Sequence, residues 1–383
     1  MAMKRASYDY IICGGGASGL LLALQMEADV YFKNKRVLLV EQQQQRSNDR
    51  TWCFWEKKPG ILEEIIFHQW DHAFFNSSNW ESHFPMAPYR YKMIRGIDFY
   101  TYAYKKIEAC AGIDLLTAQV TAITEEKNGA VVTTSKGHFE APYMFSSINT
   151  PERYLEQKKY PVLQQHFLGW TITTPTPTFK ADEIVFMDFD IPQKNTTQFM
   201  YILPFSPNKA LVEYTLFSPQ LLEKSAYEKA LKEYLNQKEI RQYTIEESEF
   251  GCIPMTAYNF DQHNSTHLLH IGTAGGWTKA STGYTFQKTI TKTQALVAFL
   301  KQQRPLNEFK VRDKYNFYDL LFLDVLSQHN GAGAQLFRTL FQNNTPETIF
   351  RFLDEQSSLW DELKIMRSFP KRIFVAALLK RLF

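Results

Sequence analysis

The sequence predicts a mixed α/β protein, α+β overall, with a Rossmann-like domain, an inserted antiparallel-sheet domain and a helical C-terminal region. Three observations predict this fold class. The chain opens with a short apolar strand, a glycine-rich turn and an apolar helix. Its middle alternates between apolar and polar residues around turn sequences, and the part that follows Arg304 and Pro305 has mainly helical periodicity.

The N-terminal segment predicts a βαβ unit. Residues 8–13 (YDYIIC) and 37–40 (VLLV) are short apolar runs, typical of buried parallel strands. Residues 20–26 between them are apolar all round, as in a helix packed beneath a sheet. A parallel pair of this kind implies a right-handed crossover. The glutamines at 42–45 are predicted to form a loop after the second strand.

Further elements follow from periodicity and turn residues. Helices are predicted at 100–111, 227–236 and 287–300. Hairpins are predicted from the paired runs 120–123 with 130–134, and 199–203 with 210–215. Residues 268–271 form a third buried strand, whereas 67–91 is aromatic-rich without helical period. Residues 169–178 alternate and contain Pro175 and Pro177, which predicts an edge strand and a loop.

Composition narrows the function classes. The 383 residues, 44% of them hydrophobic, are enough for one large core or two closely packed domains, and the net charge of +3 argues against a nucleic-acid-binding surface. The four cysteines are widely spaced, which argues against a disulfide framework or zinc site and fits a reducing compartment. The first ten residues lack signal-peptide character, and no apolar run is long enough to span a bilayer. The aromatic content of 15% suits a long apolar substrate or a cationic intermediate, besides ordinary core packing.

The glycine-rich turn after the first strand has the spacing G-x-G-x-x-G. We expect its first glycine to permit the tight turn, its second to let the backbone approach a pyrophosphate, and its third to bring helix and strand together. Glu41 ends the next strand, where a carboxylate accepts hydrogen bonds from ribose hydroxyls and disfavours a 2′-phosphate. The predicted dinucleotide ligands in this segment are Gly14, Gly16, Ser18, Gly19 and Glu41.

A second glycine cluster selects FAD over NAD as the cofactor. Residues 272–276 (GTAGG) follow the third strand and precede the STGY sequence at 281–284. Many flavoproteins return to the cofactor late in the chain in this way, whereas NAD enzymes do not need to. The candidate FAD-binding residues here are Gly272, Gly275, Thr282 and Gly283. Arg50 is a further candidate, with an ordinary surface arginine as the alternative.

These motifs divide the chain into three predicted parts. The FAD-binding Rossmann-like domain is discontinuous and comprises residues 1–66, 92–150 and 263–303. A substrate-binding domain comprises residues 67–91 and 151–262. The helical C-terminal region comprises residues 304–383.

Several sequence motifs are distributed along nearly the whole chain. The N-terminal motifs are GGGASGLLLAL at 14–24 and DRTWCFW at 49–55. The later motifs are MD at 187–188, YILP at 201–204, LVEYT at 211–215, GCIPM at 251–255, IGTAGGWTKASTGYTF at 271–286, FYDLLFLDVL at 317–326 and FLDEQSSL at 352–359. In their composition and order they resemble those of the lycopene cyclase family, flavoproteins of carotenoid synthesis, and they are most similar to bacterial β-cyclases.

The resemblance implies a non-redox, acid–base cyclisation of the ends of lycopene to β-ionone rings, giving γ-carotene and β-carotene. It implies reduced FAD, with NADPH or NADH as external reductant, and lycopene and a membrane lipid surface as partners. The expected location is cytoplasmic and peripheral to the membrane. The family's acidic motif falls on Glu213, but Tyr214 occupies the place of the second acid found in plant-like members. Thr273 stands where other flavoproteins carry an aspartate.

The residues around Glu213 are compatible with an acid catalyst. Glu213 lies in an apolar strand-like run, LVEYTLF, with Val212 and Tyr214 on the opposite face. Burial raises the pKa of a carboxyl group and keeps it protonated. The alternative is an edge-strand glutamate that faces water.

Other polar clusters carry weaker indications. Glu246, Glu247 and Glu249 read as a solvated strand, with Glu249 the best candidate for a second catalytic acid. His263, His267 and His270 pass from a loop into a strand, a placement that favours ordinary histidines, so no metal site is predicted.

Two other function classes remain open at this point. One is a redox flavoprotein, a hydroxylase or prenyl reductase acting on an isoprenoid or other apolar substrate; the other is a carotenoid or flavin carrier without activity. Residues 371–383 (KRIFVAALLKRLF) surround an apolar centre with Lys371, Arg372, Lys380 and Arg381. This tail is a candidate membrane contact, with a terminal helix docked on the protein as the alternative.

Overall fold

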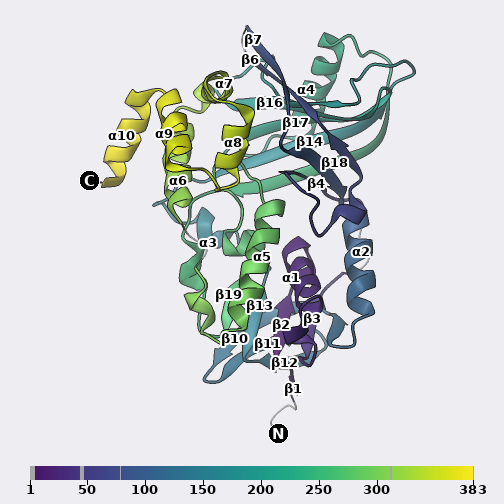
Figure 1. Ribbon diagram of the computed structural model, residues 1–383, viewed down its shortest axis with the longest axis vertical. Helices are drawn as coiled ribbons and strands as arrows, with labels where there is room; N and C mark the ends of the chain where they lie inside the picture. The colour runs from purple at the N-terminus through teal and green to yellow at the C-terminus, as the bar shows by residue number, and fades with distance from the viewer. Residues whose placement is uncertain (1–4, 44–46, 78, 311–312, 383) are drawn as a thin grey trace.

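A computed structural model describes residues 5–43, 47–77, 79–310 and 313–382. A parallel sheet lies at one end of the long axis, near the N-terminus, and a large antiparallel sheet with the C-terminal helices lies at the other (Figure 1). Gln42 and Gln43 leave the second strand without regular structure, as predicted, and the rest of that glutamine run lies outside the described residues. No helix among the described residues is long and apolar enough to cross a membrane.

The parallel sheet confirms the predicted βαβ unit. Its strands are β2 (Tyr10–Cys13), β3 (Val37–Glu41), β9 (Ile113–Thr117), β13 (Tyr143–Ser146) and β19 (Leu268–His270). They are ordered β19-β13-β2-β3-β9, and every neighbouring pair is parallel. Successive side chains point to opposite faces, so Ile12 and Leu39 pack among the helices while Ile11 and Leu38 pack against a second sheet. Burial on both faces explains why these strands are continuous apolar runs.

Both faces of the parallel sheet are covered. One face carries α1 (Ala17–Glu27), α2 (Gly96–Glu108) and α5 (Phe286–Leu300). The other face carries β10 (Val120–Glu126), β11 (Gly129–Thr134) and β12 (Gly137–Ala141), with the short β1 (Ala6–Ser7) at its edge. The predicted helices at the first face and the first predicted hairpin are therefore confirmed. A short helix, α3 (Glu152–Leu155), begins the path to the upper sheet.

The antiparallel region contains a seven-stranded and a three-stranded sheet. The larger sheet has the order β18 (Thr244–Met255), β14 (Leu163–Thr173), β17 (Lys209–Ser218), β16 (Thr197–Ser206), β15 (Glu183–Asp188), β6 (His72–Ser77) and β7 (Trp80–Pro85). Only the β15–β6 pair is parallel among the described strands of this sheet. The smaller sheet is β4 (Thr51–Glu56), β8 (Arg90–Arg95) and β5 (His68–Trp70). The second predicted hairpin is confirmed as β16 and β17.

The prediction of an edge strand at 169–178 is wrong. The strand in question, β14, begins earlier, at Leu163, and hydrogen-bonds with β17 on one side and β18 on the other. Pro175 and Pro177 lie beyond its last residue, in the connection to β15, so neither proline interrupts a ladder. The edges of the sheet are β18 and β7.

Helices cover the two faces of the seven-stranded sheet differently. The single helix α4 (Lys224–Gln237) packs on one face. The other face packs with the C-terminal helices α6 (Lys314–Gln328), α7 (Gly333–Asn343), α8 (Pro346–Leu353), α9 (Leu359–Ser368) and α10 (Lys371–Leu382). The helical C-terminal region is thus confirmed, while the domain boundaries stay a prediction. This arrangement leaves space between the sheet, the C-terminal helices and the start of α1.

Candidate active site

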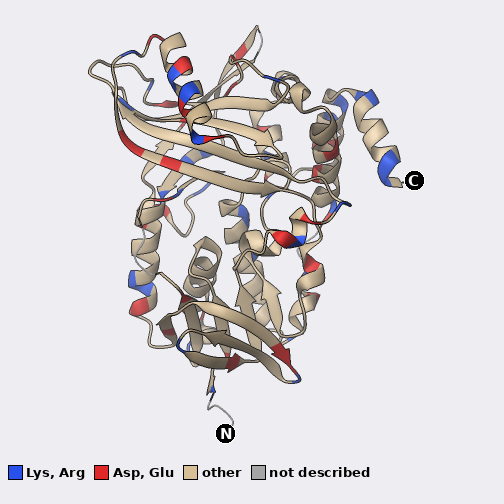
Figure 2. Ribbon diagram, turned by 180° about the vertical axis from the view of Figure 1, so that it is seen from behind, with Lys and Arg blue, Asp and Glu red and all other residues tan. Residues whose placement is uncertain are grey.

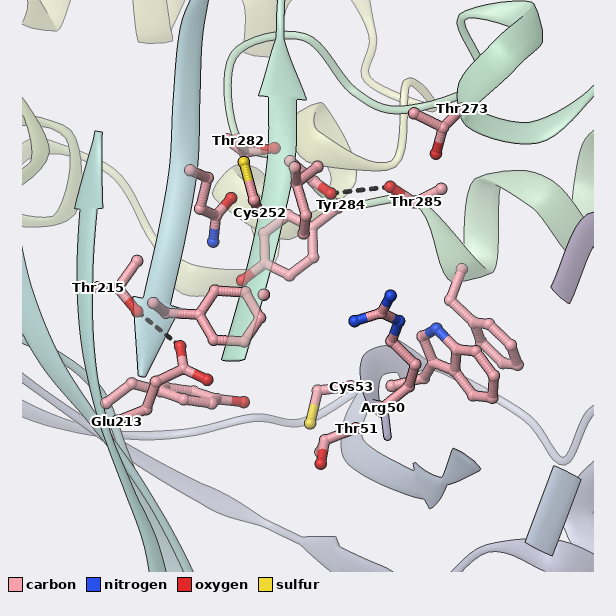
Figure 3. A pocket seen from close by; sticks show the side chains of 18 of the residues that line it. Arg50, Thr51, Cys53, Glu213, Thr215, Cys252, Thr273, Thr282, Tyr284 and Thr285 are labelled. Atoms are coloured by element: carbon pink, nitrogen blue, oxygen red, sulfur yellow. Dashed lines mark hydrogen bonds between the residues drawn. The ribbon is translucent and has the colours of Figure 1, made fainter. Parts of the chain in front are cut away.

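A cavity of about 540 Å³ lies between the parallel-sheet part and the antiparallel-sheet part of the molecule. Its lining joins segments that are far apart in the sequence: residues 16–18 at the start of α1, 49–53 leading into β4, parts of β14, β16, β17 and β18, residues 282–286 before and at the start of α5, and three residues of α7. The carboxylate of Glu213 and the guanidinium of Arg50 enter it from different sides (Figure 3). One cavity therefore touches both glycine-rich segments and both candidate catalytic acids.

The glycine-rich turn has the geometry that its sequence predicts. Gly14 has φ +106°, and a Cβ built on it would lie 2.2 Å from Ser147 Oγ. A Cβ on Gly19 would lie 2.0 Å from the carbonyl oxygen of Gly14, so only glycine lets the helix start this close to the strand. Gly16 differs, because its Cβ would meet no described atom within 4 Å and the residue lines the cavity. The space next to Gly16 is therefore not filled by the protein and is available to a ligand.

Glu41 ends β3 beside this turn, as predicted. Its buried carboxylate accepts hydrogen bonds from the backbone N–H of Gly15, at 2.6 Å, and of Gln43, at 3.0 Å. Ser18 is buried at the start of α1 and lines the cavity, whereas Gly14, Gly19 and Glu41 stand behind it. The Glu41 carboxylate therefore binds the backbone of Gly15, which directly precedes the cavity-lining Gly16.

The late glycine-rich segment meets the turn in space. Gly272 has φ +63°, and a Cβ on it would lie 2.4 Å from Ser18 Oγ. Gly283 has φ +75°, and its Cβ would lie 2.0 Å from Oε1 of Gln165 on β14. Gly272, Gly283 and Thr282 line the cavity, but Gly275 packs behind them against the backbone of His270. The late segment thus bridges the start of α1 and the antiparallel sheet.

Unpaired polar atoms in the cavity fit a polar ligand such as FAD. Oδ1 of Asp49, Oε1 of Gln165 and Oγ1 of Thr282 are buried and have no hydrogen-bond partner among the described residues. All three residues line the cavity. Buried polar atoms are rarely left unpaired, so each of these is available to a bound molecule. Together with the open space above Gly16, they form a cradle compatible with a dinucleotide.

The two candidate acids occupy one row across the antiparallel sheet. The strand register aligns Tyr201 on β16, Glu213 on β17, Gly169 on β14 and Glu249 on β18. Directly opposed residues of antiparallel strands point to the same face, here the cavity. A Cβ on Gly169 would lie 3.6 Å from Glu213 Cβ and 3.3 Å from Glu249 Cγ. Because Gly169 has no side chain, it leaves a gap on the cavity face of the sheet, with Glu213 on one side of the gap and Glu249 on the other.

Glu213 sits in surroundings that favour its protonated form. Its residue is buried, and Oε1 accepts a hydrogen bond from the hydroxyl of Thr215 at 2.5 Å. Burial raises the pKa of the Glu213 carboxyl to about 8, and the negative charge of Glu249 adds to this rise, while the Thr215 hydrogen bond opposes it. Glu213 is therefore largely a carboxylic acid at neutral pH. The predicted alternation also holds, because Val212 and Tyr214 pack on the α4 face.

Glu249 is half-buried and has polar partners that Glu213 lacks. Its Oε2 accepts a hydrogen bond from Thr51 Oγ1 at 2.7 Å. Burial raises the pKa of Glu249 above its ordinary value, and the Thr51 hydrogen bond and the charge of Arg50 only partly oppose this rise. Its neighbours Glu246 and Glu247 are exposed, as the solvated-strand interpretation predicts. Only Glu249 of this acidic run lines the cavity.

Tyr214 does not replace the second family acid. Its ring packs in the cluster beneath α4, and its hydroxyl donates to Gln198 Oε1 at 2.5 Å on that side of the sheet. Even a carboxylate at this position would point away from the cavity. The second carboxylate of the cavity comes instead from β18.

Aromatic side chains form most of the remaining wall. They are Trp52, Tyr91, Tyr100, Phe167, Phe186, Phe199, Tyr201, Phe217, Phe250, Tyr284, Phe286, Phe337 and Phe341. The hydroxyls of Tyr91 and Tyr201 are 2.7 Å apart, and burial raises the pKa of both well above the usual value, which keeps them neutral. Sequence reasoning missed these tyrosines and Gly169. The alternation of β16 was the available signal for Tyr201, since it places Tyr201 with Phe199 on one face.

The three histidines of the H-x3-H-x2-H run have separate partners. His263 Nε2 lies 2.7 Å from the hydroxyl of Tyr258, and His267 Nδ1 lies 2.8 Å from the carbonyl oxygen of Pro142. His270 Nε2 lies 2.8 Å from Arg153 Nη1. Within the described part of the chain, no group of His, Cys, Asp and Glu side chains is arranged to hold a metal ion.

Comparison with known proteins agrees with this fold. The family model described as "Lycopene cyclase protein" matches residues 9–379. A lycopene beta-cyclase from Pseudescherichia vulneris is 24% identical over 94% of this chain and 94% of its own length.

Solved structures share the architecture at low identity. A geranylgeranyl bacteriochlorophyll reductase-like protein from Thermoplasma acidophilum is 13% identical with a TM-score of 0.63, covering 99% of this chain and 100% of its own. A flavoprotein/dehydrogenase from Cytophaga hutchinsonii is 14% identical with a TM-score of 0.58, covering 98% and 99%. These likenesses show a Rossmann-like fold of the kind found in FAD-dependent enzymes. Because the family model spans nearly the whole sequence, the chain belongs to the lycopene cyclase family.

Proposed function

We propose that this protein is a lycopene beta-cyclase that closes the ends of lycopene to β-ionone rings by acid–base chemistry, with reduced FAD as cofactor. The observation that carries the proposal is the buried carboxyl group of Glu213. Its raised pKa keeps a proton available at neutral pH, inside a largely apolar, aromatic cavity that also touches both glycine-rich segments.

The reaction begins with a proton transfer. Glu213 gives its proton to C2 of the terminal C1=C2 bond of lycopene, which leaves a tertiary cation at C1. The electrons of the C5=C6 bond then form the C1–C6 bond, and the positive charge moves to C5. Loss of the proton on C6 completes the ring. One proton enters and one leaves, so the reaction has no net redox change.

The chain's residues supply the other requirements of this reaction. Glu249 is the proposed second acid–base group, because it lines the same cavity and lies across the Gly169 gap from Glu213. The faces of Phe167 and Phe199 can stabilise a passing cation by cation–π attraction. An apolar wall excludes water, which would otherwise capture the cation as an alcohol.

The residues fit FAD, as described above. The proposed ligands that line the cavity are Gly16, Ser18, Arg50, Gly272, Thr282 and Gly283, and the proposed binding residues Gly14, Gly19, Glu41 and Gly275 support them from behind. When bound in its reduced form, the cofactor supplies negative charge that stabilises a cation. Gly16 leaves room for the pyrophosphate, and the start of α1 points its N–H groups at the cavity. NADPH or NADH is the proposed source of the electrons that keep it reduced.

A redox flavoprotein acting on an isoprenoid is the second candidate. Its support is the fold likeness to a reductase-like protein and to a flavoprotein/dehydrogenase. The two candidates differ in what they consume. A cyclase uses no stoichiometric NAD(P)H and no oxygen, whereas a hydroxylase consumes both and a reductase consumes NAD(P)H.

Expression of the chain in lycopene-producing cells tests the proposal. We expect the extracted pigment to change from lycopene to γ-carotene and β-carotene, and purified holoprotein to perform the same conversion without oxygen. Unchanged lycopene, or a hydroxylated or hydrogenated product, would contradict it. Because lycopene resides in the bilayer, we further propose a cytoplasmic enzyme in peripheral contact with the membrane.

A further inference from the structure

Helix α9 exposes an apolar face to solvent. Leu359 is 69% exposed, Trp360 79%, Leu363 44% and Met366 42%. Their spacing places them along one side of the helix, while Glu362 and Ile365 on the other side are buried. A tryptophan exposed to this degree gains nothing from the protein core.

Helix α10 adds to this surface. Val375 is 51% exposed, Leu379 50% and Leu382 62%. Ile373 and Phe374, which belong to the apolar centre of residues 371–383, pack against the core instead. The two helices are consecutive, separated only by Phe369 and Pro370, and α10 projects from the side of the molecule (Figure 2). We call the seven exposed residues the C-terminal apolar surface: Leu359, Trp360, Leu363, Met366, Val375, Leu379 and Leu382.

Arg381 fixes α10 to the protein and is not free to contact lipid. Its guanidinium donates to both carboxylate oxygens of Asp324 on α6, at 2.6 Å each, and to the carbonyl oxygen of Lys159 at 2.8 Å. The docked-helix alternative therefore holds for this end of α10, and the expectation that Arg381 serves as a lipid contact is wrong. The apolar side chains that remain outside belong to a helix held in place.

The surroundings of the C-terminal apolar surface are positively charged. Residues 359–382 contain six Lys or Arg and two Asp or Glu, so this segment alone exceeds the net charge of +3 of the whole chain. Both acidic residues are neutralised, Asp361 by Arg351 and the buried Glu362 by Lys314. Five basic residues are exposed and form no ion pair within the described part of the chain: Lys364, Arg367, Lys371, Arg372 and Lys380. Basic residues lie near both ends of α10 (Figure 2).

The same helical layer reaches the cavity. Helix α7 packs against α9, and its residues Phe337, Leu340 and Phe341 line the cavity on the opposite side. An apolar molecule held at the outer surface of α9 would thus be one helix away from the aromatic wall.

We propose that the C-terminal apolar surface docks into the headgroup region of an anionic lipid bilayer, with Trp360 as its main anchor. The apolar side chains enter the acyl boundary, and the exposed lysines and arginines contact lipid phosphates. This assignment rests on the proposed function in one respect: docking would bring the enzyme to a hydrocarbon substrate in the bilayer. The amount of apolar surface and the uniform sign of the exposed charge favour a bilayer over an acidic protein.

Trp360→Glu tests the proposal, with Val30→Glu as its matched control. Val30 is 83% exposed and lies before the second strand of the parallel sheet, so both variants add one carboxylate at an exposed apolar position. We expect Trp360→Glu to weaken sedimentation with phosphatidylcholine vesicles containing phosphatidylglycerol by about tenfold or more. Val30→Glu should sediment as the wild type does, and added salt should weaken wild-type binding. Both variants should keep wild-type cyclisation of lycopene supplied in detergent micelles.

A second measurement, quenching of tryptophan fluorescence, compares the wild type with a conservative variant. Brominated-acyl lipids should quench part of the wild-type tryptophan emission, and Trp360→Phe should lose most of that quenching. The proposal is overturned if Trp360→Glu sediments like the wild type. It is also overturned if the wild type is a dimer that Trp360→Glu dissociates in light scattering without vesicles, because the surface would then bind a second copy. A wild type that binds vesicles through Trp360 but does not cyclise lycopene would contradict the proposed function and leave this surface assigned.

Discussion

Glu213 and Glu249 have the same side chain but different surroundings. Among the described residues, Glu213 forms no ion pair and accepts one hydrogen bond from a neutral hydroxyl. Glu249 has Thr51 and the charge of Arg50 beside it. Surroundings that separate the pKa values of two nearby carboxyls also separate their roles, with the higher value belonging to the proton donor. The negative charge that Glu249 carries when it is ionised adds to the rise in the pKa of Glu213.

Glu213→Gln tests the role of the donor. We expect the variant to fold and to bind FAD, because glutamine keeps the shape of the side chain and can still accept from Thr215. Its rate of cyclisation should fall by roughly two to four orders of magnitude, the usual effect of losing a general acid. Purified variant and wild type should be compared at equal flavin occupancy. A near wild-type rate would place the proton donor elsewhere, with Glu249 the next residue to test.

The pH dependence of cyclisation follows from the same group. Burial raises the pKa of Glu213 from its ordinary value to about 8, so its proton is present below that pH and lost above it. We therefore expect the rate to be high near neutrality and to fall as pH rises through about 8. The profile should be recorded with substrate in micelles, since vesicle binding has its own pH dependence. A rate that rises across this range would contradict a protonated donor.

Gly169→Ala tests the gap between the two acids. The added Cβ would lie 3.0 Å from Leu211 Cδ1 and 3.3 Å from Glu249 Cγ, so the Glu249 side chain must move. We expect turnover to fall roughly tenfold to a hundredfold, as for other small displacements in active sites. As the charge of Glu249 moves away, the pKa of Glu213 and the midpoint of the pH profile should both fall. Thr171→Ala on the same strand is the control, and an unchanged rate and midpoint in Gly169→Ala would exclude a positioning role.

At the scale of elements, the N-terminal turn shows what a sequence can predict. Its strands and helix are local apolar runs, and the spacing of its glycines is a local feature, so pattern and spacing suffice to predict the turn. Strand β14 shows the opposite, because Pro175 and Pro177 suggested an edge strand although both lie beyond its end. Which strands flank β14 depends on distant parts of the chain. Local periodicity contains no such information.

Gly16→Val tests the glycine-rich turn as a cofactor site. The position faces open space, so the new side chain should disturb the protein little and occupy the room that we assign to the FAD pyrophosphate. We expect the purified variant to lose the flavin absorbance of the wild type while keeping its far-UV circular dichroism. Ala28→Val, at the exposed C-terminal end of the same helix, is the control. A full flavin spectrum in Gly16→Val would contradict the assignment.

At the scale of the molecule, the site is assembled from segments of very different predictability. Glu213 was predictable, because strand alternation and an apolar context both point to it. For Glu249 the sequence offered only its membership of an acidic run, as the best candidate there for a second acid. Its alignment with Glu213 across Gly169 depends on the register of three strands, which the sequence does not reveal. The sequence predicts the terminal helix but not which of its basic residues bind the protein. The ion pair of Arg381 depends on Asp324 on α6, which is distant in the sequence.

The fate of solvent hydrogen tests the central claim, acid–base cyclisation, most directly. Holoenzyme with reduced FAD should be incubated with lycopene in D2O without oxygen, and the carotenoid product analysed by mass spectrometry alongside the NAD(P)H consumed. We expect a single solvent deuterium in each ring, in the methylene group formed from C2, with no stoichiometric loss of NAD(P)H. A ring product without solvent deuterium, or one that consumes NAD(P)H in proportion to the rings formed, would contradict it.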